Sequence, residues 1–358
     1  MDFALVGLPQ SGKTTLFQAL TAGHGSASAG QELLGTVKVP DERLEKLAVL
    51  VKAKKITPLE IRLHDLPSVF NKGQGPSGTA AETLGKCDAL LHVVHAFNRP
   101  DVPHPNETID PSRDIAAFDS ELLFFDLGVV ERRLDKLETS MRSGKVTERE
   151  AAEREKALLE RVKTAIEGDT PLRNVITDPA DVKALGNYGL LSLKPMLIVL
   201  NIGEGDVADQ DKTAAEYAGK HNAERTRVTA ICAKLEAELA ELPAGEAAEF
   251  RKEMGAPEGG TDLVLSQARE LLGLITFYTA GEKDTRAWTL VEGGTALQAA
   301  GRIHTDIERG FIRAEVIGWD KLLEYGSHNE AKKVGQLRQE GKTYVVKEGD
   351  VLNVLFNV

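Results

Sequence analysis

The chain has 358 residues, which is long for a single compact core and predicts two or three domains. Its hydrophobic fraction of 42% and charged fraction of 28% are those of an ordinary globular protein. A net charge of −11 excludes a protein that coats nucleic acid with its whole surface, so any contact with RNA must be local. The only cysteines, Cys87 and Cys232, lack metal-ligand spacing and indicate neither a zinc site nor a disulfide framework, which favours a reducing cytosol.

The chain begins with a short apolar strand at residues 2–6, without the basic lead of a signal peptide and too short to span a membrane. The pattern GLPQSGKT follows at once, and TTLFQAL continues with helical spacing. A G-x-x-x-x-G-K-[ST] pattern between a strand and a helix is the context of a phosphate-binding P-loop. Gly7 and Gly12 let the backbone bend so that its N–H groups face the phosphates. Lys13 can then reach the β- and γ-phosphates, and the hydroxyl of Thr14 can ligate Mg²⁺. The P-loop residues expected at the nucleotide are Pro9, Gln10, Ser11, Gly12, Lys13, Thr14 and Thr15.

The segment LEIRLHD alternates apolar and polar residues and ends in Asp65, the natural second group at a P-loop Mg²⁺. Thr14 and Asp65 are therefore the predicted metal site. The alternative is a carboxylate that only ends a strand. A GTPase would continue as D-x-x-G, whereas this chain has Ser68 in the place of the glycine, so the second switch is altered.

Two further apolar runs, residues 88–97 and 195–201, suit parallel strands that are buried on both faces. The Gly-, Ser- and Ala-rich segment 23–35 predicts a mobile loop. With the first strand and the P-loop, these features predict an α/β P-loop NTPase domain with a mostly parallel sheet.

The pattern changes between those two runs. Residues 127–141 have helical spacing, RSGK interrupts them, and a second helical stripe follows, which predicts an inserted antiparallel helical hairpin at 129–189. Residues 132–163 hold ten Lys and Arg against seven acids, so the segment is +3 in an acidic chain. A basic face for RNA and a solvated coiled coil of mixed charge are equally open interpretations.

The last part of the chain, roughly 275–358, combines strands rich in β-branched and aromatic residues with a short Ala-rich helix at 295–303. This composition predicts a small α+β domain. Its charge is near neutral, which excludes a simple basic groove.

Base recognition should follow the run at 195–201. The tetrapeptide NIGE at 201–204 occupies the place of N-K-x-D, and ICAK at 231–234 resembles the S-A-K loop that supports the base. The Asp of N-K-x-D accepts two hydrogen bonds from guanine, and the longer Glu204 shifts this carboxylate, so a strict guanine preference is not expected. The residues expected around the base are Asn201, Ile202, Glu204, Cys232, Ala233 and Lys234.

The chain has four further motifs, which are VPDERLEKLA, ELLGLITFYTAGEKDTRAWTL, QAAGRIHTDIERGFIRAEVI and EGKTYVVKEGDVLNVLFNV. Together with the motifs above, they resemble those of the Obg-like ATPase subfamily of translation-factor-related NTPases, the YchF type. The resemblance spans nearly the whole chain. It implies an OBG-type G domain at 1–128 and 190–274 and a C-terminal TGS domain with a ubiquitin-like fold at 275–358. It also implies ATP used at least as readily as GTP, bound Mg²⁺, and association with the ribosome, through its large subunit or its RNA. We expect a cytoplasmic monomer that binds neither DNA nor membrane.

Three positions depart from the family pattern. Gln10 stands where the family usually has Asn, a position linked to potassium-dependent hydrolysis, so K⁺ remains a candidate second cation. Gly30 falls near the expected Thr of switch I, and Ser68 replaces the switch II glycine. The hydroxyl residues nearest to that Thr, none of them in register, are Ser26, Ser28 and Thr36. The departures favour slow hydrolysis and leave open a degenerate scaffold that binds nucleotide without turnover. For a small-molecule phosphotransferase, no Arg-bearing lid and no acceptor pocket is found.

The family also lacks the water-orienting Gln of switch II and carries an apolar residue there, as Val69 does here. A family His in a mobile loop after the strand HVVHAF is the proposed substitute, and His104 in RPDVPHPNE matches its place. The resemblance thus makes His104 the catalytic candidate. The alternative is an exposed loop histidine between two prolines.

Overall fold

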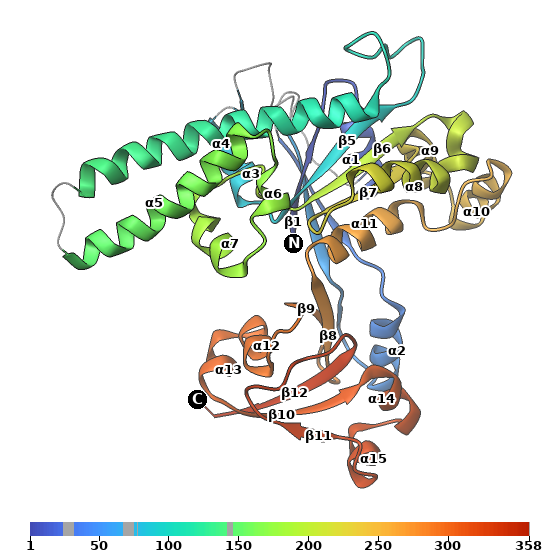
Figure 1. Cartoon of the computed structure of the whole chain (residues 1–358). Coiled ribbons are helices and arrows are strands. Elements are labelled where there is room, and N and C mark those ends of the chain that lie inside the picture. Colours follow the sequence, from blue (N-terminus) through green and yellow to red (C-terminus); the bar gives the residue numbers. More distant parts are fainter. Residues whose placement is uncertain (24–31, 67–74, 77, 142–145, 358) are drawn as a thin grey trace. The chain divides into compact units, whose positions relative to one another are not determined.

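The computed structural model describes residues 1–23, 32–66, 75–76, 78–141 and 146–357 (Figure 1). The altered switch positions Gly30 and Ser68 lie outside these residues, as do the candidate hydroxyls of Ser26 and Ser28 and the apolar Val69. Internal contacts divide the chain into two compact units. The first unit comprises Met1–Val37 and Arg62–Leu271, and the second Lys38–Ile61 and Leu272–Val358. The domain boundaries that the resemblance implies remain a prediction.

The first unit is built on a six-stranded sheet of order β2-β4-β1-β5-β6-β7. Its strands are β1 (Asp2–Val6), β2 (Leu33–Lys38), β4 (Glu60–Asp65), β5 (Ala89–Ala96), β6 (Met196–Ile202) and β7 (Thr226–Ile231). β1 pairs in parallel with β4 and β5, and β5, β6 and β7 continue the sheet in parallel. All seven residues of β6 are buried, so both faces of the sheet are covered. The predicted α/β fold with a mostly parallel sheet is confirmed.

The helices of this unit follow the strands. They are α1 (Lys13–Leu20), α3 (Gly78–Lys86), α4 (Pro111–Met141), α5 (Val146–Glu167), α6 (Leu172–Val175), α7 (Pro179–Leu185), α8 (Gln210–His221), α9 (Ala233–Ala240), α10 (Ala244–Glu253) and α11 (Gly260–Leu271). α1 packs against α9, and α8 and α11 pack against β7. The predicted loop 23–35 was too long at its end, because β2 begins at Leu33. Gly35 lies inside β2, where a Cβ would come within 2.5 Å of Thr21 Cγ2 and 2.9 Å of Phe17 Cζ, so this glycine serves close packing and not a turn.

α4 and α5 form the predicted antiparallel pair of helices (Figure 1). Apolar side chains of both helices share one cluster, to which Leu137, Leu159 and Val162 belong. α4 starts at Pro111, well before the predicted residue 127. The carboxylate of Asp110 accepts a hydrogen bond from the Arg113 backbone N–H at 3.1 Å, so an N-cap followed by proline opens the helix.

The second unit contains a six-stranded sheet of order β11-β10-β12-β8-β9-β3. Its strands are β3 (Ile56–Thr57), β8 (Leu274–Ala280), β9 (Thr285–Val291), β10 (Phe311–Gly318), β11 (Arg338–Glu340) and β12 (Asp350–Phe356). Its helices are α2 (Glu42–Leu50), α12 (Ala296–Ile303), α13 (Thr305–Arg309), α14 (Trp319–Tyr325) and α15 (His328–Lys333). The α+β character predicted for the C-terminal part is confirmed.

One early segment, 38–61, belongs to this second unit and supplies α2 and β3. The Asp41 carboxylate caps α2 and accepts a hydrogen bond from the Tyr278 hydroxyl at 2.5 Å. Arg43 bridges Asp41 and Glu348, at 3.0 Å and 2.6 Å. The segment is thereby bonded to Tyr278 of β8 and to Glu348, which lie more than two hundred residues later in the chain.

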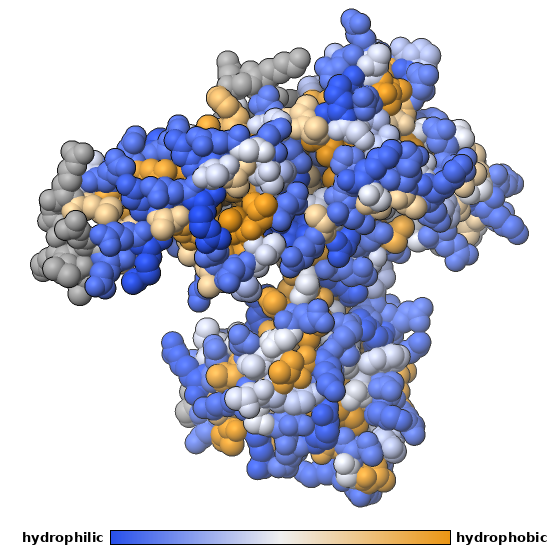
Figure 2. Space-filling model, viewed as in Figure 1, coloured by the Kyte–Doolittle hydropathy of each residue, from blue (hydrophilic) through white to orange (hydrophobic). Residues whose placement is uncertain are grey.

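On the face drawn in Figure 2, hydrophobic residues lie in small groups among hydrophilic ones. Among the described residues, no helix has the length and apolar character needed to cross a membrane.

Candidate nucleotide site

The P-loop follows β1 and leads into α1. Gly7 has φ +140° and Gly12 has φ +90°, backbone conformations that favour glycine. A Cβ at Gly7 would lie 2.3 Å from the Val93 carbonyl oxygen, and one at Gly12 would lie 2.2 Å from Asn201 Nδ2. Only glycine therefore lets the loop lie this close to β5 and β6, with the free N–H groups of the α1 N-terminus at its end.

Lys13 is the first residue of α1 and is buried. Its Nζ donates to the carbonyl oxygens of Gly7 at 3.0 Å and Leu8 at 2.9 Å. Burial lowers the pKa of Lys13, and the neighbouring Asp65 carboxylate opposes this shift. Phosphate oxygens are charged acceptors and therefore better partners for this ammonium group than neutral carbonyls.

The two predicted metal ligands meet although they are 51 positions apart in the chain. The Thr14 hydroxyl donates to Asp65 Oδ2 at 2.7 Å. Burial raises the pKa of Asp65, while the Thr14 hydrogen bond and the Lys13 charge lower it. Hydroxyl and carboxylate oxygens are ligands that Mg²⁺ accepts, usually together with phosphates and water, so this pair fits the ion. Within the described residues, no group of three or more His, Cys, Asp and Glu side chains offers another metal site.

The rest of the loop is unevenly exposed. Pro9 and Gln10 are exposed, Thr15 is half-buried and Ser11 is fully buried. Among the described atoms, the Ser11 hydroxyl has no hydrogen-bond partner, so it has bonding capacity to spare at the bend of the loop. Gln10 has φ +63°, a left-handed conformation that Asn adopts more readily than Gln. The departure at position 10 therefore places a less suited residue in a constrained turn.

Asn201 joins the P-loop to the predicted base-binding segment. Its Nδ2 donates to the Ser11 carbonyl at 2.9 Å, and its Oδ1 accepts from the Ala233 backbone N–H at 3.0 Å. Of the other residues expected around the base, Ile202 and Cys232 have side chains in the hydrophobic core. Any contact of these two residues with a base must come from their backbone.

Glu204 and Lys234 form an ion pair, with 2.7 Å between Glu204 Oε2 and Lys234 Nζ. Lys234 also lies 3.6 Å from Glu238 Oε1. The Glu204 and Lys234 side chains are about two fifths exposed, so the pair is accessible from solvent. Lys234 thus competes with a guanine edge for one of the two Glu204 oxygens.

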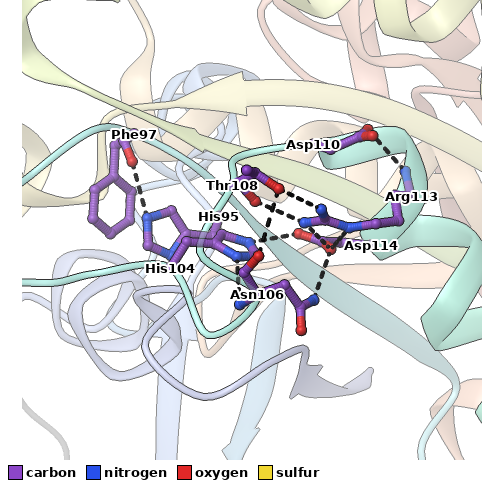
Figure 3. A network of polar contacts seen from close by, with 8 residues as sticks. All are labelled: His95, Phe97, His104, Asn106, Thr108, Asp110, Arg113 and Asp114. Carbon is purple, nitrogen blue, oxygen red and sulfur yellow. Dashed lines mark hydrogen bonds and ion pairs between the residues drawn. The ribbon is translucent and has the colours of Figure 1, made fainter.

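The predicted catalytic histidine is neither exposed nor free (Figure 3). His104 is 8% exposed, and its Nδ1 accepts the backbone N–H of Asn106 at 3.0 Å. Because a backbone N–H can only donate, the ring proton is on Nε2, which donates to Asp114 Oδ2 at 2.7 Å. The ring also lies 4.8 Å from that of His95, centroid to centroid. The alternative of an exposed loop histidine is therefore wrong, both ring nitrogens are occupied, and the catalytic role stays a prediction.

Asp114 is the residue at this site that sequence reasoning missed. It is buried in the first turn of α4, and its other oxygen accepts from Arg113 Nε and Nη2, each at 3.0 Å. The helix-start signal was present in IDPSRD, where Asp110 precedes Pro111. If the helix is taken to start at Pro111, Asp114 falls in its first turn, where the helix dipole favours a carboxylate.

Thr36, one of the hydroxyls that the sequence offered for the switch I ligand, is exposed in the middle of β2. Ser26 and Ser28 lie outside the described residues, so the switch I ligand stays unassigned.

Comparison with known proteins places these features in one family. Residues 2–122 match the family MMR_HSR1, described as 50S ribosome-binding GTPase, and residues 274–357 match YchF-GTPase_C, described as a protein of unknown function (DUF933). The chain is 38% identical over 368 residues to the "Ribosome-binding ATPase YchF" of Bacillus subtilis (strain 168), with 99% of this chain and 98% of the relative covered. It is 36% identical over 364 residues to the protein of the same name from Haemophilus influenzae, with the same coverage. The structure of the Schizosaccharomyces pombe YchF GTPase superimposes with a TM-score of 0.82 at 26% identity and covers 99% of this chain and 97% of that one. With this identity over nearly its full length, the chain belongs to the YchF family.

Proposed function

We propose that this protein is a ribosome-associated NTPase that binds ATP with Mg²⁺, hydrolyses it slowly and changes its affinity for the ribosome with the bound nucleotide. The observation that carries the nucleotide part is the Thr14–Asp65 contact of 2.7 Å beside Lys13 at the start of α1. Thr14 and Asp65 would hold Mg²⁺ there, and the ion would supply positive charge to offset the charge that develops on the phosphates. The names of the relatives support the ribosomal part.

Several finer assignments belong to the same proposal. K⁺ is a candidate second cation at Gln10, and GTP is a weaker substrate. His104 is the proposed catalytic residue. We place the protein in the cytoplasm as a monomer that contacts the large ribosomal subunit.

The alternative is a scaffold that binds nucleotide without turnover, which the departures at Gln10, Gly30 and Ser68 keep open. The ribosomal part is tested by sedimenting purified ribosomes with the full-length protein in ADP, in ATP and in a non-hydrolysable ATP analogue. We expect the bound fraction to differ between ADP and the analogue. Equal binding in all three states would contradict a nucleotide switch, and no binding in any state would contradict ribosome association.

The base-binding segment predicts that ATP binds at least as tightly as GTP, because Lys234 engages the Glu204 carboxylate. Isothermal titration with both nucleotides measures this ratio. Glu204→Asp shortens the side chain by one methylene, which weakens the contact with Lys234, and should raise the relative affinity for GTP by about tenfold.

Lys234→Ala is the matched control, because it removes the ammonium partner of Glu204 and leaves the Glu204 side chain at its full length. If the ion pair alone suppresses guanine binding, this variant and Glu204→Asp should shift the ratio equally. A wild-type preference for GTP of about a hundredfold, or about 2.7 kcal/mol, would refute the interpretation.

A further inference from the structure

Four of the ten basic residues at 132–163, namely Arg133, Lys156, Arg161 and Lys163, form ion pairs with acids of α4, α5 or α7 that the structure describes. Arg133 contacts Glu155 at 2.6 Å, and Lys156 contacts Glu138 at 3.0 Å. The remaining pairs are Lys156–Glu160, Lys163–Glu131, Lys163–Glu167 and Arg161–Asp181. Ion pairs of this kind are typical of a coiled coil of mixed charge, and they leave the net charge of the segment at +3, so the basic face for RNA stays an open interpretation.

A different basic surface forms in the second unit from two segments that are far apart in the sequence. The Lys54 backbone N–H donates to the Glu282 carbonyl at 2.8 Å, and the Thr285 N–H donates to the Lys55 carbonyl at 3.0 Å. β3 then pairs in parallel with β9, with Ile56 opposite Thr285. These bonds place residues 54–57 beside residues 282–286. Lys52 stands two positions before Lys54, and we call residues 52–57 and 282–286 together the lysine patch.

The lysine patch is dense in positive charge. Its cations are Lys52, Lys54, Lys55, Lys283 and Arg286, and its acids are Glu282 and Asp284, which gives +3 within eleven residues. The four lysines are exposed, and none of them makes an ion pair with any residue that the structure describes. Asp284 already accepts a hydrogen bond from the Thr57 hydroxyl at 2.9 Å, and Arg286 stacks 4.1 Å over the Trp288 ring. The lysine ammonium groups are thus available to an external anion.

Lys52 adds an independent sign of function. It follows the end of α2 with φ +52°, the left-handed conformation in which glycine is favoured. The bonds Lys52 N–H to Val49 O at 3.2 Å and Ala53 N–H to Ala48 O at 2.9 Å close the helix around it. A lysine stands where a glycine would be less strained, and local backbone strain of this kind occurs at functional positions.

We propose that the lysine patch binds the phosphate backbone of ribosomal RNA. This inference rests on the proposed ribosome association and assigns it to a surface. Flexible lysine ammonium groups suit phosphates as point charges, and the −11 charge of the whole chain repels RNA elsewhere, so the contact must be local. Ile56 is the one large apolar side chain with notable exposure among the described patch residues, at 48%, which does not suit an apolar protein partner.

A second interpretation explains the same lysines without RNA. β3 is a two-residue edge strand, and lysines at a sheet edge prevent pairing with other chains. This interpretation predicts that removing the lysines causes aggregation and leaves ribosome affinity unchanged. It explains Lys52 least, because Lys54 and Lys55 directly precede β3 whereas Lys52 stands four positions before that strand, just after α2.

The test compares two full-length quadruple variants with equal change in net charge. The patch variant carries K52Q, K54Q, K55Q and K283Q. The control variant carries K156Q, K163Q, K220Q and K333Q, four lysines that are each in an ion pair. Affinity for purified ribosomes and for protein-free ribosomal RNA is measured across a salt series, with ATP affinity and melting temperature as checks of folding.

We expect the patch variant to bind ribosomes and RNA roughly a hundredfold more weakly at 0.1 M salt, with a log–log salt slope shallower by about 3. The control variant should bind like the wild type. K52G alone should weaken binding about fivefold while the melting temperature stays or rises, because one phosphate contact is lost and backbone strain is relieved.

Each failure has a separate meaning. Wild-type protein that does not bind ribosomes contradicts the proposed function. If the wild type binds ribosomes and the patch variant binds them equally well, with or without aggregation, the role of the lysine patch is refuted and the proposed function stands. Loss of ribosome binding by the patch variant while wild-type protein ignores free RNA would place the contact on an acidic ribosomal protein and overturn the choice of RNA.

Discussion

Lys13→Ala is expected to weaken ATP binding by at least about a hundredfold, because a charge-assisted bond to phosphate inside a buried loop is worth roughly 1.5–3 kcal/mol and several phosphate oxygens share this ammonium group. The same side chain donates to the Gly7 and Leu8 carbonyls, so its removal also loosens the P-loop. Binding is measured by titration of a fluorescent ATP analogue in Mg²⁺, with competition by unlabelled ATP.

Lys194→Ala provides the matched control for folding. Lys194 also donates to two backbone carbonyls, those of Gly85 and Cys87, and burial likewise lowers its pKa. We expect both variants to lower the melting temperature and only Lys13→Ala to lose ATP. Near-unchanged ATP affinity in Lys13→Ala would overturn the P-loop assignment.

The sequence predicted the first unit well because its signals are local. A P-loop is a continuous pattern between a strand and a helix, and buried parallel strands such as β5 and β6 are continuous apolar runs. The pairing of Thr14 with Asp65 followed from the two groups expected at a P-loop Mg²⁺, which are the hydroxyl after the P-loop lysine and an acid at the end of a later strand.

The sequence did not predict the place of segment 38–61, because what fixes it is not local. β3 has only two residues, too few for any periodicity, and the hydrogen bond from Tyr278 to Asp41 spans 237 positions. The sequence did not predict the lysine patch for the same reason. Residues 52–57 and residues 282–286 each hold only a few charges, and they form a dense group only where the two segments lie together.

The sequence did not predict the buried environment of His104, and the reason is physical. Proline on both sides and a polar stretch are typical of an exposed loop, but a buried carboxylate ten residues later satisfies the ring. Asp114 has that place because α4 starts at Pro111, earlier than apolar spacing alone indicated.

The isolated protein is expected to hydrolyse bound ATP slowly, and ribosomes are expected to accelerate the reaction. Phosphoryl transfer depends mainly on positioning and on stabilising the charge of a loose transition state. The intact contacts of Lys13, Thr14 and Asp65 support binding, whereas the departures at Gln10, Gly30 and Ser68 remove orientation. Each lost contact costs roughly 1–3 kcal/mol of transition-state stabilisation, or about five- to 150-fold in rate, and a partner that orders the site restores part of it.

Single-turnover cleavage of γ-labelled ATP, with and without ribosomes and with K⁺ or Na⁺, measures this directly. No cleavage under any condition, with tight binding retained, would favour the scaffold. Fast cleavage by the isolated protein would mean that the departures at Gln10, Gly30 and Ser68 cost little transition-state stabilisation.

Two variants then separate a catalytic role of His104 from a structural one. If the ring orients the attacking water, it must first leave Asp114, whose Oδ2 holds its Nε2 at 2.7 Å. His104→Ala should then slow ribosome-stimulated cleavage by about a hundredfold, a usual value for a lost acid–base group, while Asp114→Asn, which weakens the hold on the ring, should speed it. If His104 only fastens its loop to α4, both variants should lower the melting temperature and leave the rate per folded molecule unchanged. If the contact is purely structural, either variant disrupts the same His104–Asp114 hydrogen bond, so the two variants should have the same effect. Opposite effects on the rate therefore require that the His104 ring leaves Asp114.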